Sequence, residues 1–365
     1  MTSRKNWGNR PWHVEFRPQP HTLPQSVDFA VVGGGFSGLA AALHFKYLAP
    51  SKSVALFEAE TIGSGASGFT GGVALAESAA GDLPGLGDVL AGYQHFIRGH
   101  NLQTDLHLPG CYEVARSNPL PDSPISWSDS GRLAVTKEVP GGTIDPGKTV
   151  SELARAAEAA GVLVLEHTAV LEANFAGPLK LHTPSGSVQA AQVLFATNAF
   201  ALELSGIPGH AAFTTAVLTE PLTDDALAAI GLADRKPFYT VDLPYLWGRL
   251  LGNAVIFGCG LIFFDDWRDL HTLDISSPHA AEVFDLLETR VHNLHPILAR
   301  VQITNRWGGP ICISDDWKPV FRRHPQSENC LVLGAFSGHG VAQSVYLGIW
   351  AAESLLGMRA LPDWA

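Results

Sequence analysis

The feature that most constrains this chain is a glycine-rich turn that follows a valine-rich segment near the N-terminus. Residues 27–32 are mostly apolar, and a helical pattern is established by Leu39. Gly33, Gly35 and Gly38 have the G-x-G-x-x-G spacing. Glycines so spaced allow a tight turn, close approach of the backbone to a pyrophosphate, and close packing of helix on strand. The segment therefore predicts a strand, turn and helix whose first N–H groups bind the phosphates of a dinucleotide.

A second apolar segment and the acid after it support this interpretation. Residues 53–57 have the composition of a strand, and Glu58 follows them directly. An acid about twenty residues after the last glycine of the turn commonly binds the ribose of a dinucleotide. The alternative is an ordinary glycine turn with an unrelated surface acid, which requires strand, spacing and acid to coincide by chance.

Two further glycine-rich segments could also approach a ligand. Residues 62–72 are rich in glycine and serine and precede an alanine-rich segment, so they suit a second anion cradle, or alternatively a flexible linker. Near the C-terminus, residues 329–335 predict a strand, residues 336–340 a glycine turn, and residues 341–356 a helix. We expect this unit to meet the first glycine turn around one ligand, which would make the nucleotide domain discontinuous.

Length and composition indicate a globular protein with two domains. The chain has 365 residues, of which 46% are hydrophobic and 16% charged, so it has enough apolar residues for more than one core. The formal net charge of −11 argues against a nucleic-acid partner. No apolar run is long enough to span a membrane, and the polar N-terminus lacks the apolar core of a signal peptide. A cytoplasmic protein is therefore expected.

The four cysteines have no spacing typical of a metal site, so no metal is expected. Among the other segments, residues 169–173 are expected to form a strand. Residues 187–193 predict one arm of a hairpin and residues 193–199 a separate buried strand. The predicted nucleotide-binding domain comprises residues 27–90, 145–200 and 311–365, the antiparallel-sheet α+β substrate domain residues 91–144 and 201–310, and the N-terminal arm residues 1–26.

These segments together resemble the D-amino-acid oxidase superfamily of FAD-dependent oxidoreductases, especially the sarcosine oxidase, glycine oxidase and γ-glutamylputrescine oxidase branch. The resemblance implies an α/β fold with a Rossmann-type, glutathione-reductase-like FAD-binding domain. The motifs that carry it extend over almost the whole chain: residues 31–39, 56–59, 62–68, 70–72, 196–198, 306–309, Asp315 or Asp316 with Pro319, and residues 334–341.

The resemblance implies that FAD is the cofactor, and the spacing around Cys312 favours non-covalent binding. Glu58 would bind the adenosine ribose and the backbone of Val170 the adenine, while the turn before the last helix would surround the pyrimidine end of the flavin. The implied cofactor-binding residues are Gly33, Gly35, Phe36, Ser37, Gly38, Glu58, Ala59, Ser64, Gly65, Ala66, Ser67, Thr70, Gly71, Gly72, Val170, Thr197, Asn198, Trp307, Gly309, Ser337, Gly338, His339, Gly340 and Val341.

The resemblance further implies oxidation of the C–N bond of a small amine or amino acid. In such enzymes hydride passes to flavin N5, water hydrolyses the resulting imine, and oxygen is the expected acceptor, giving hydrogen peroxide. No separate base is essential if the substrate amine enters neutral, so no catalytic residue is assigned. The alternatives are a flavin-dependent dehydrogenase with another acceptor, a flavin monooxygenase, and a flavin-bound protein without catalytic activity.

Several positions depart from the pattern of this branch. Phe69 stands where relatives often have arginine, and Ala342 where sarcosine oxidases have a lysine that holds the substrate carboxylate. Residues 255–258 lack the lysine that promotes reaction with oxygen in sarcosine oxidases. Both the acceptor and the substrate class therefore remain open.

The candidate substrate-binding residues lie mainly on one predicted strand. Arg249 is a cation that could clamp a substrate carboxylate, or it is a structural arginine. Tyr245 and Trp247 could line an amine pocket, or they belong to the core of the sheet. His339 could face the substrate or only pack at the start of its helix. Cys312 lies near the segment where some relatives attach FAD covalently, but its spacing differs, so a buried free thiol is expected.

Overall fold

The first sheet is organised around β1 (Ser26–Val32), in which Phe29, Ala30 and Val31 are completely buried. The computed structural model describes residues 5–176 and 178–364. The strand order is β17-β18-β11-β1-β2-β8, and β10 and β9 extend from β11. β18, β11, β1, β2 and β8 run parallel, as expected for strands joined through helices. The remaining strands are β2 (Val54–Phe57), β8 (Leu163–Leu165), β9 (Glu172–Asn174), β10 (Leu179–Thr183), β11 (Gly186–Phe195), β17 (Val320–His324) and β18 (Ser327–Gly334).

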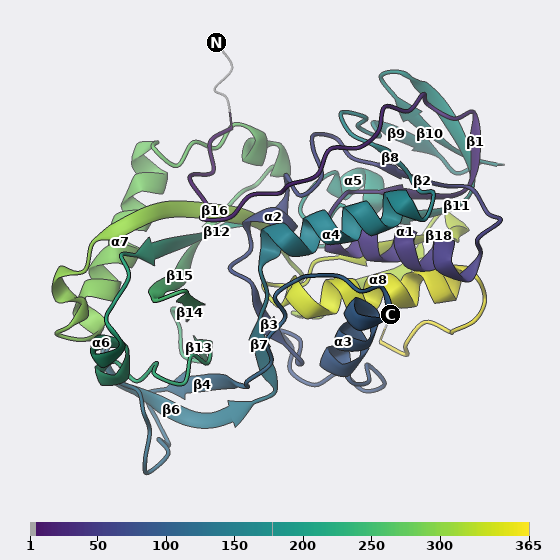
Figure 1. Ribbon diagram of the computed structural model, residues 1–365. Coiled ribbons are helices and arrows are strands. Elements are labelled where there is room, and N and C mark those ends of the chain that lie inside the picture. The colour runs from purple at the N-terminus through teal and green to yellow at the C-terminus, as the bar shows by residue number, and fades with distance from the viewer. Residues whose placement is uncertain (1–4, 177, 365) are drawn as a thin grey trace.

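Helices from distant parts of the chain cover one face of this sheet (Figure 1). They share one hydrophobic core, to which β1 contributes Phe29 and Val31. α1 and α8 pack closely against each other although they belong to opposite ends of the chain. The helices of this layer are α1 (Phe36–Leu48), α3 (Val89–Gly99), α4 (Pro146–Ala159) and α8 (Gly340–Leu355).

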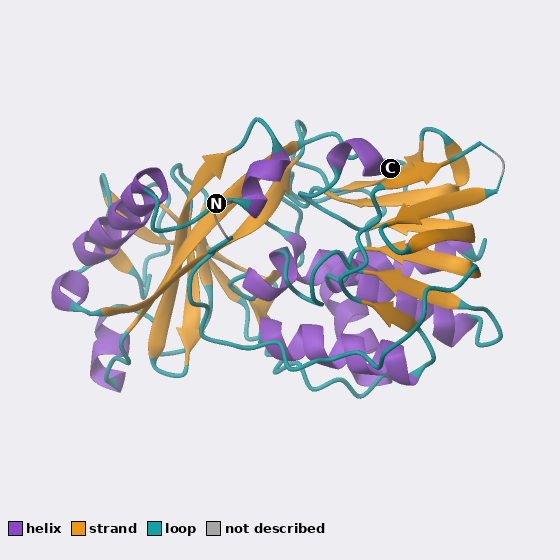
Figure 2. Cartoon of the chain, turned by 90° about the horizontal axis from the view of Figure 1, so that it is seen from above, coloured by secondary structure: helices purple, strands orange, loops and turns teal. Residues whose placement is uncertain are grey.

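The second sheet is largely antiparallel, with the order β16-β12-β15-β14-β13-β4-β6-β5. α7 (Pro278–Leu294) packs through Phe284 and Val291 into a core that includes Phe257 of this sheet. Figure 2 shows helices on the outer side of this sheet, away from the first sheet. Its strands are β4 (Cys111–Ala115), β5 (Ser126–Ser128), β6 (Arg132–Val139), β12 (His210–Thr219), β13 (Phe238–Thr240), β14 (Leu246–Leu251), β15 (Ala254–Phe263) and β16 (Ile303–Ile313).

Short elements connect the two sheets. The smallest sheet pairs two segments that lead from one large sheet to the other. In the described part of the chain, no helix is both long and apolar enough to cross a membrane. The connecting elements are α2 (Ala66–Phe69), β3 (Val73–Leu75), β7 (Gly141–Thr143) and α5 (Leu202–Ser205). The other short elements, α6 (Asp224–Ala229) and the 3-10 helices Trp267–His271 and Leu298–Arg300, join elements on the side of the second sheet.

The predicted fold class, a Rossmann-type domain with a second sheet domain, is confirmed. Two local predictions were wrong. Residues 187–199 do not form two strands, because β11 continues without a break from the hairpin into the centre of the sheet. Residues 169–171 lie outside any strand, and β9 begins at Glu172. For β11 the pairing with β1 and β18, which are distant in sequence, decides how far the strand extends, whereas β9 is limited to the residues that pair with neighbouring β10.

Two segments have different surroundings from those expected of their predicted domains. α3 was grouped with the substrate domain, but Leu90, Tyr93 and Phe96 pack into the core that contains α1 and α8. We therefore propose that α3 belongs to the nucleotide-binding domain. In the N-terminal arm, Trp7 and Trp12 are buried, so part of the arm contributes to the cores rather than lying on the surface.

A histidine at the contact between α1 and α8 provides a test of this packing. Burial lowers the pKa of His44, and its pairing with Glu353, at 3.3 Å, only partly opposes that effect. A lowered pKa means that the unfolded chain binds the proton more readily, so stability is present above the unfolded pKa and declines as pH falls through it. We expect His44→Gln to reduce this decline by up to ~1.4 kcal/mol per pH unit between pH 7 and 5.

Urea unfolding at a series of pH values measures this effect, and the difference between variant and wild type isolates His44 from other titrating groups. His210→Gln is the control, because the side chain of His210 is 68% exposed. If wild type and His44→Gln had the same pH dependence, His44 would not be buried in this contact.

Candidate active site

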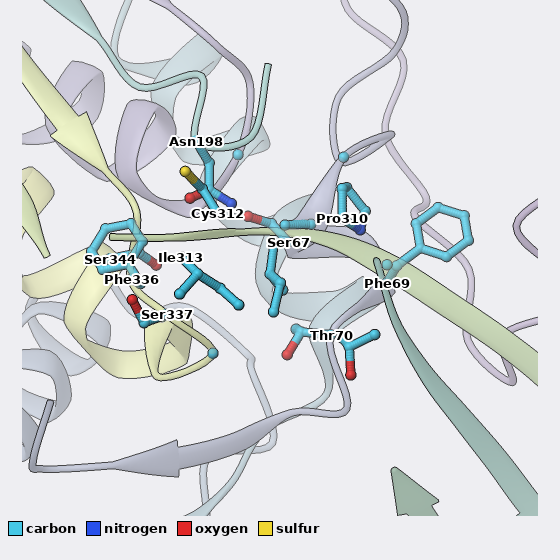
Figure 3. A pocket seen from close by; sticks show the side chains of 18 of the residues that line it. Ser67, Phe69, Thr70, Asn198, Pro310, Cys312, Ile313, Phe336, Ser337 and Ser344 are labelled. Atoms are coloured by element: carbon cyan, nitrogen blue, oxygen red, sulfur yellow. The ribbon is translucent and has the colours of Figure 1, made fainter. Parts of the chain in front are cut away.

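One cavity of about 1170 Å³ lies between the two sheets. It is larger than most small-molecule pockets, which measure roughly 300–1,000 Å³. One side is formed by the glycine turn after β1, the segment around α2 and the turn before α8, and the opposite side by strands of the second sheet. Figure 3 shows Asn198, Ser67, Thr70 and Ser337 around this space, with Cys312 on the strand that crosses it. The cavity thus joins segments that are far apart in the sequence.

The N-termini of α1 and α8 face this cavity, and neither N-cap residue caps its helix with a side chain; in α1 the N–H of Phe36 donates instead to Oγ of Ser67 at 2.9 Å. By contrast, the side chains of Asp88, Asp145 and Thr223 cap α3, α4 and α6. The first N–H groups of a helix need an acceptor, and the helix dipole gives that end a partial positive charge. The two uncapped helices therefore present donors to a ligand that carries negative charge, as a pyrophosphate does.

Glu58 lies at the nucleotide end of the cavity, immediately after β2. Its carboxylate accepts hydrogen bonds from the N–H of Gly34 at 2.8 Å and from the N–H of Glu60 at 2.9 Å. Burial raises its pKa, while these two N–H groups oppose the effect. The carboxylate is therefore held in place by the glycine turn, and its remaining acceptor positions suit the hydroxyl groups of a ribose.

The backbone is strained where β11 and β18 reach the cavity. Asn198, Ala335 and Ser337 all have a positive φ, near 50°, which non-glycine residues seldom adopt. The Oδ1 atom of Asn198 accepts a hydrogen bond from the N–H of Ala335 at 3.0 Å, which joins the two strand ends. Strain of this kind persists only where the surroundings enforce it, and it is concentrated at functional sites.

The residues of the cavity fit FAD. Thr197 Oγ1 and Ser344 Oγ belong to lining residues, are buried, and have no hydrogen-bond partner among residues 5–176 and 178–364. Buried hydroxyl groups normally find a partner, so these two indicate a polar ligand. At Gly35 the backbone is accessible to a ligand, because a methyl group at this position would approach only the side chain of Ser67. Hydroxyl groups, an open backbone and two uncapped helices match the ribityl, pyrophosphate and flavin groups of FAD.

Most of the predicted cofactor residues line the cavity. The predicted residues that do so are Gly33, Gly35, Phe36, Ser37, Glu58, Ala59, Ser64, Gly65, Ala66, Ser67, Thr70, Gly71, Val170, Thr197, Asn198, Gly309, Ser337, Gly338, His339, Gly340 and Val341. Gly38, Gly72 and Trp307 lie behind the lining. A side chain at Gly38 would overlap the carbonyl oxygen of Gly33, so this glycine permits helix-to-strand packing. Trp307 is buried and donates from Nε1 to the carbonyl oxygen of Phe69 at 3.1 Å.

Arg249 is also behind the lining, which corrects the prediction that it clamps a substrate carboxylate. It is 4% exposed, and its guanidinium donates to the carbonyl oxygens of Gly71 and Leu250. Burial lowers its pKa to about 10. Arg249 therefore supports the segment that contains Gly71 instead of facing the cavity. The sequence could not show this, because the segment of Gly71 and Gly72 that covers Arg249 is far from β14 in the sequence.

Trp247 lines the cavity and is held between two backbone segments. Side chains at Gly71 and Gly258 would both overlap its indole ring, so these glycines make room for the ring. Tyr245 lines the cavity as well but is 44% exposed, which places it at the mouth. The predicted positions of both aromatic side chains at the cavity agree with the structure.

His339 is the residue at which α8 begins, and it lines the cavity. Burial lowers its pKa, and the carbonyl oxygen of Ser337 and the charge of Glu77 act in the opposite direction. The imidazole is therefore held in its neutral form near pH 7, in which one nitrogen donates and the other accepts a hydrogen bond.

Three acidic residues that line the cavity could not be named from the sequence: Glu60, Glu77 and Glu113. Glu113 carried a signal: Tyr112 and Val114 belong to the core between the second sheet and α7, so alternation along β4 directs Glu113 to the cavity. Glu77 follows β3 in an irregular segment and had no such periodic pattern.

Comparisons with known proteins agree with this geometry. The family described as FAD dependent oxidoreductase matches residues 28–354. The chain is 27% identical to gamma-glutamylputrescine oxidoreductase of Escherichia coli K12 over 391 positions, which cover 92% of this chain and 85% of that protein. It is 25% identical to the probable oxidoreductase OrdL of Rhizobium meliloti over 401 positions, which cover 95% of this chain and 88% of that protein.

Solved structures share the fold. The L-proline dehydrogenase of P. horikoshii superposes with a TM-score of 0.73 at 19% identity, covering 93% of this chain and 96% of that one. The glycine oxidase of Geobacillus kaustophilus gives 0.72 at 19% identity, covering 94% and 98%. The family match extends over nearly the whole chain and includes both glycine turns that meet at the cavity. The chain therefore belongs to the family of FAD-dependent oxidoreductases.

Proposed function

We propose that this protein uses FAD to oxidise the C–N bond of a small amine or amino acid. Bound FAD supplies the two-electron acceptor, and the protein supplies the position, the electrostatics and the access. The observation that carries the proposal is the cavity itself: two uncapped helix N-termini on one side, and on the other a sheet whose lining includes Trp247 and Tyr239. The names of relatives that act on amines and amino acids support it.

The lining residues hold the substrate rather than exchange protons with it. Trp247 and Tyr239 would shield a bound substrate from water, and the N–H groups at the start of α8 would favour negative charge on a flavin held beside them. Neutral His339 at the same helix start provides one donor and one acceptor at the cavity.

Anaerobic mixing of the FAD-loaded protein with a panel of D- and L-amino acids, N-methyl amino acids, monoamines and polyamines tests the proposal. Loss of the absorbance of oxidised flavin with one class of compound would support it. If no compound in this panel reduced the flavin, the alternative of a flavin-bound protein without amine-oxidising activity would be favoured. Consumption of NADPH would instead favour a monooxygenase.

The electron acceptor is proposed to be oxygen. Among the described residues that line the cavity, the only lysine is Lys5, which pairs with Glu60 beside Glu58. The described lining therefore has no lysine of the kind that promotes reaction with oxygen in sarcosine oxidases, and the proposal of oxygen rests on the family resemblance alone. Rapid mixing of the reduced protein with oxygenated buffer separates the two cases: fast reoxidation indicates an oxidase, and slow reoxidation a dehydrogenase that uses another acceptor.

FAD is proposed to be bound without a covalent link. Cys312 is the cysteine nearest to the expected attachment segment, and it lines the cavity. Burial raises the pKa of its thiol to about 12, so little reactive thiolate is present at neutral pH. Acid precipitation should leave the yellow colour in the supernatant, whereas a yellow pellet would show a covalent bond.

A further inference from the structure

The wall of the cavity contributed by β3, β4 and β13 carries negative charge. Tyr239 pairs in register with Glu113 on one neighbouring strand and with Trp247 on the other. Glu113, Tyr239 and Trp247 therefore lie side by side on adjacent strands, and all of them line the cavity together with Glu77. We call Glu77, Glu113 and Tyr239 the acidic face.

Within the acidic face, one phenol proton is shared between two carboxylates. The hydroxyl of Tyr239 donates to Glu77, and Glu113 Oε2 lies 3.4 Å from the same hydroxyl oxygen. A phenol has one proton to donate, so it cannot satisfy both acids at once. Burial and the hydrogen bond to Glu77 raise the pKa of Tyr239, which keeps that single proton in place.

The protein compensates only part of this charge. Lys137 pairs with Glu113 at 3.0 Å, and Thr136 donates to the same carboxylate at 2.9 Å. Glu77 has no ion pair among residues 5–176 and 178–364, and Tyr239 is its one hydrogen-bond donor there. Two carboxylates thus face the cavity with one cation beside them, and the side chain of that lysine is 55% exposed.

The described lining of the cavity has no unpaired cation that could bind a negatively charged substrate group. No arginine lines it within the described ranges, Lys5 is paired with Glu60, and Arg249 lies behind Gly71. A substrate carboxylate would therefore be buried without a cation, which is costly. An ammonium group would meet two carboxylates and, in Trp247, an aromatic ring on the next strand.

We propose that the acidic face binds a second ammonium group of the substrate, so that the substrates are diamines or longer polyamines rather than amino acids with a free carboxylate. This proposal rests on the proposed function and names its substrate class. The distal ammonium anchors the molecule at Glu77 and Glu113 while the reacting amine lies at the flavin side of the cavity. The distal group takes no part in the bond changes.

Three compounds of equal chain length test this directly: 1,4-diaminobutane, n-butylamine and 4-aminobutanoate. We expect 1,4-diaminobutane to reduce the flavin at a half-saturating concentration roughly tenfold or more below that of n-butylamine, because charge-assisted hydrogen bonds favour the diamine. The carboxylate compound should be the poorest of the three. Equal values for the diamine and the monoamine, or a preference for 4-aminobutanoate, would overturn the proposal.

The double variant Glu77→Gln/Glu113→Gln should lose the preference for the diamine, so that its half-saturating concentrations for 1,4-diaminobutane and n-butylamine become similar. Glu138→Gln is the matched control, because Glu138 lies on neighbouring β6, outside the cavity lining, and pairs with Lys236 at 2.7 Å. A diamine preference that survives in the double variant would overturn the proposal. If the double variant did not fold, a measurement on the wild type would still decide. Added salt should raise the half-saturating concentration of the diamine and not that of the monoamine.

The two proposals can fail separately. Perturbation of the oxidised flavin spectrum measures binding of 1,4-diaminobutane without turnover. Diamine binding that depends on Glu77 and Glu113, without flavin reduction by any amine, would support the acidic face and contradict the proposed function. Flavin reduction by amino acids with no effect of the double variant would support the function and overturn the acidic face.

Discussion

Replacing Gly35 by aspartate is expected to abolish FAD binding while the protein remains folded. A side chain at Gly35 would approach only the side chain of Ser67, with Oγ at 2.8 Å, so the fold can accommodate it. The new carboxylate would lie at the uncapped N-terminus of α1, where the pyrophosphate is expected. Repulsion between the two anions, together with the lost approach of the backbone, should weaken FAD affinity by at least ~100-fold.

Titration of the apoprotein with FAD, followed by flavin fluorescence, measures this loss. Circular dichroism and the urea midpoint show whether the fold is kept. Gly99→Asp is the matched control, because a side chain at Gly99, in the last turn of α3, would meet no other atom within 4 Å. Tight FAD binding by Gly35→Asp would show that the pyrophosphate does not bind at this turn.

Replacing Gly348 by leucine is expected to destabilise the whole nucleotide-binding layer. A side chain at Gly348 would overlap the carbonyl oxygen of Ser37, which lies in the first turn of α1 and lines the cavity. α8 could not keep its present distance from α1, and overpacking against backbone should cost about 3 kcal/mol. Because both helix starts face the cavity, FAD affinity should fall as well.

The change in free energy of unfolding can be measured by urea titration of the apoprotein, and FAD affinity by the same fluorescence titration as above. Ile349→Leu is the control: it adds leucine at the next position of α8, at nearly constant volume. Wild-type stability in Gly348→Leu would contradict the close contact of the two helices.

The nucleotide-binding segments could be predicted from the sequence because their signals are local. The turn at Gly33 to Gly38, the acid at Glu58 and the turn before α8 each combine a strand, glycines and a helix within a short stretch. The backbone N–H groups make the contacts with a phosphate, so the positions of the glycines already indicate where a phosphate can bind. Twenty-one of the 24 proposed cofactor residues consequently line the cavity, and Gly38, Gly72 and Trp307 do not.

The substrate side could be predicted less well because it depends on the direction of side chains. Arg249 and Trp247 are two positions apart on β14, yet one supports Gly71 from behind and the other lines the cavity. The glycines that admit the ring of Trp247 come from β15 and from the segment before β3. Glu113 lies on β4, whose pairing with β13 no local pattern specifies, and Glu77 lies in the irregular segment after β3. Such contacts become visible only when the tertiary structure is known.

The contact between Ser37 and Gly348 has a consequence for biosynthesis. The two halves of the cofactor-binding layer are separated by roughly three hundred residues, so a ribosome must synthesise α8 long after α1 before the two helices can dock. Until then the side of α1 that packs against α8 stays exposed, although α4 can already cover another side. FAD binding would thus follow translation of α8. Chains interrupted before residue 340 should therefore bind no FAD and be susceptible to proteases.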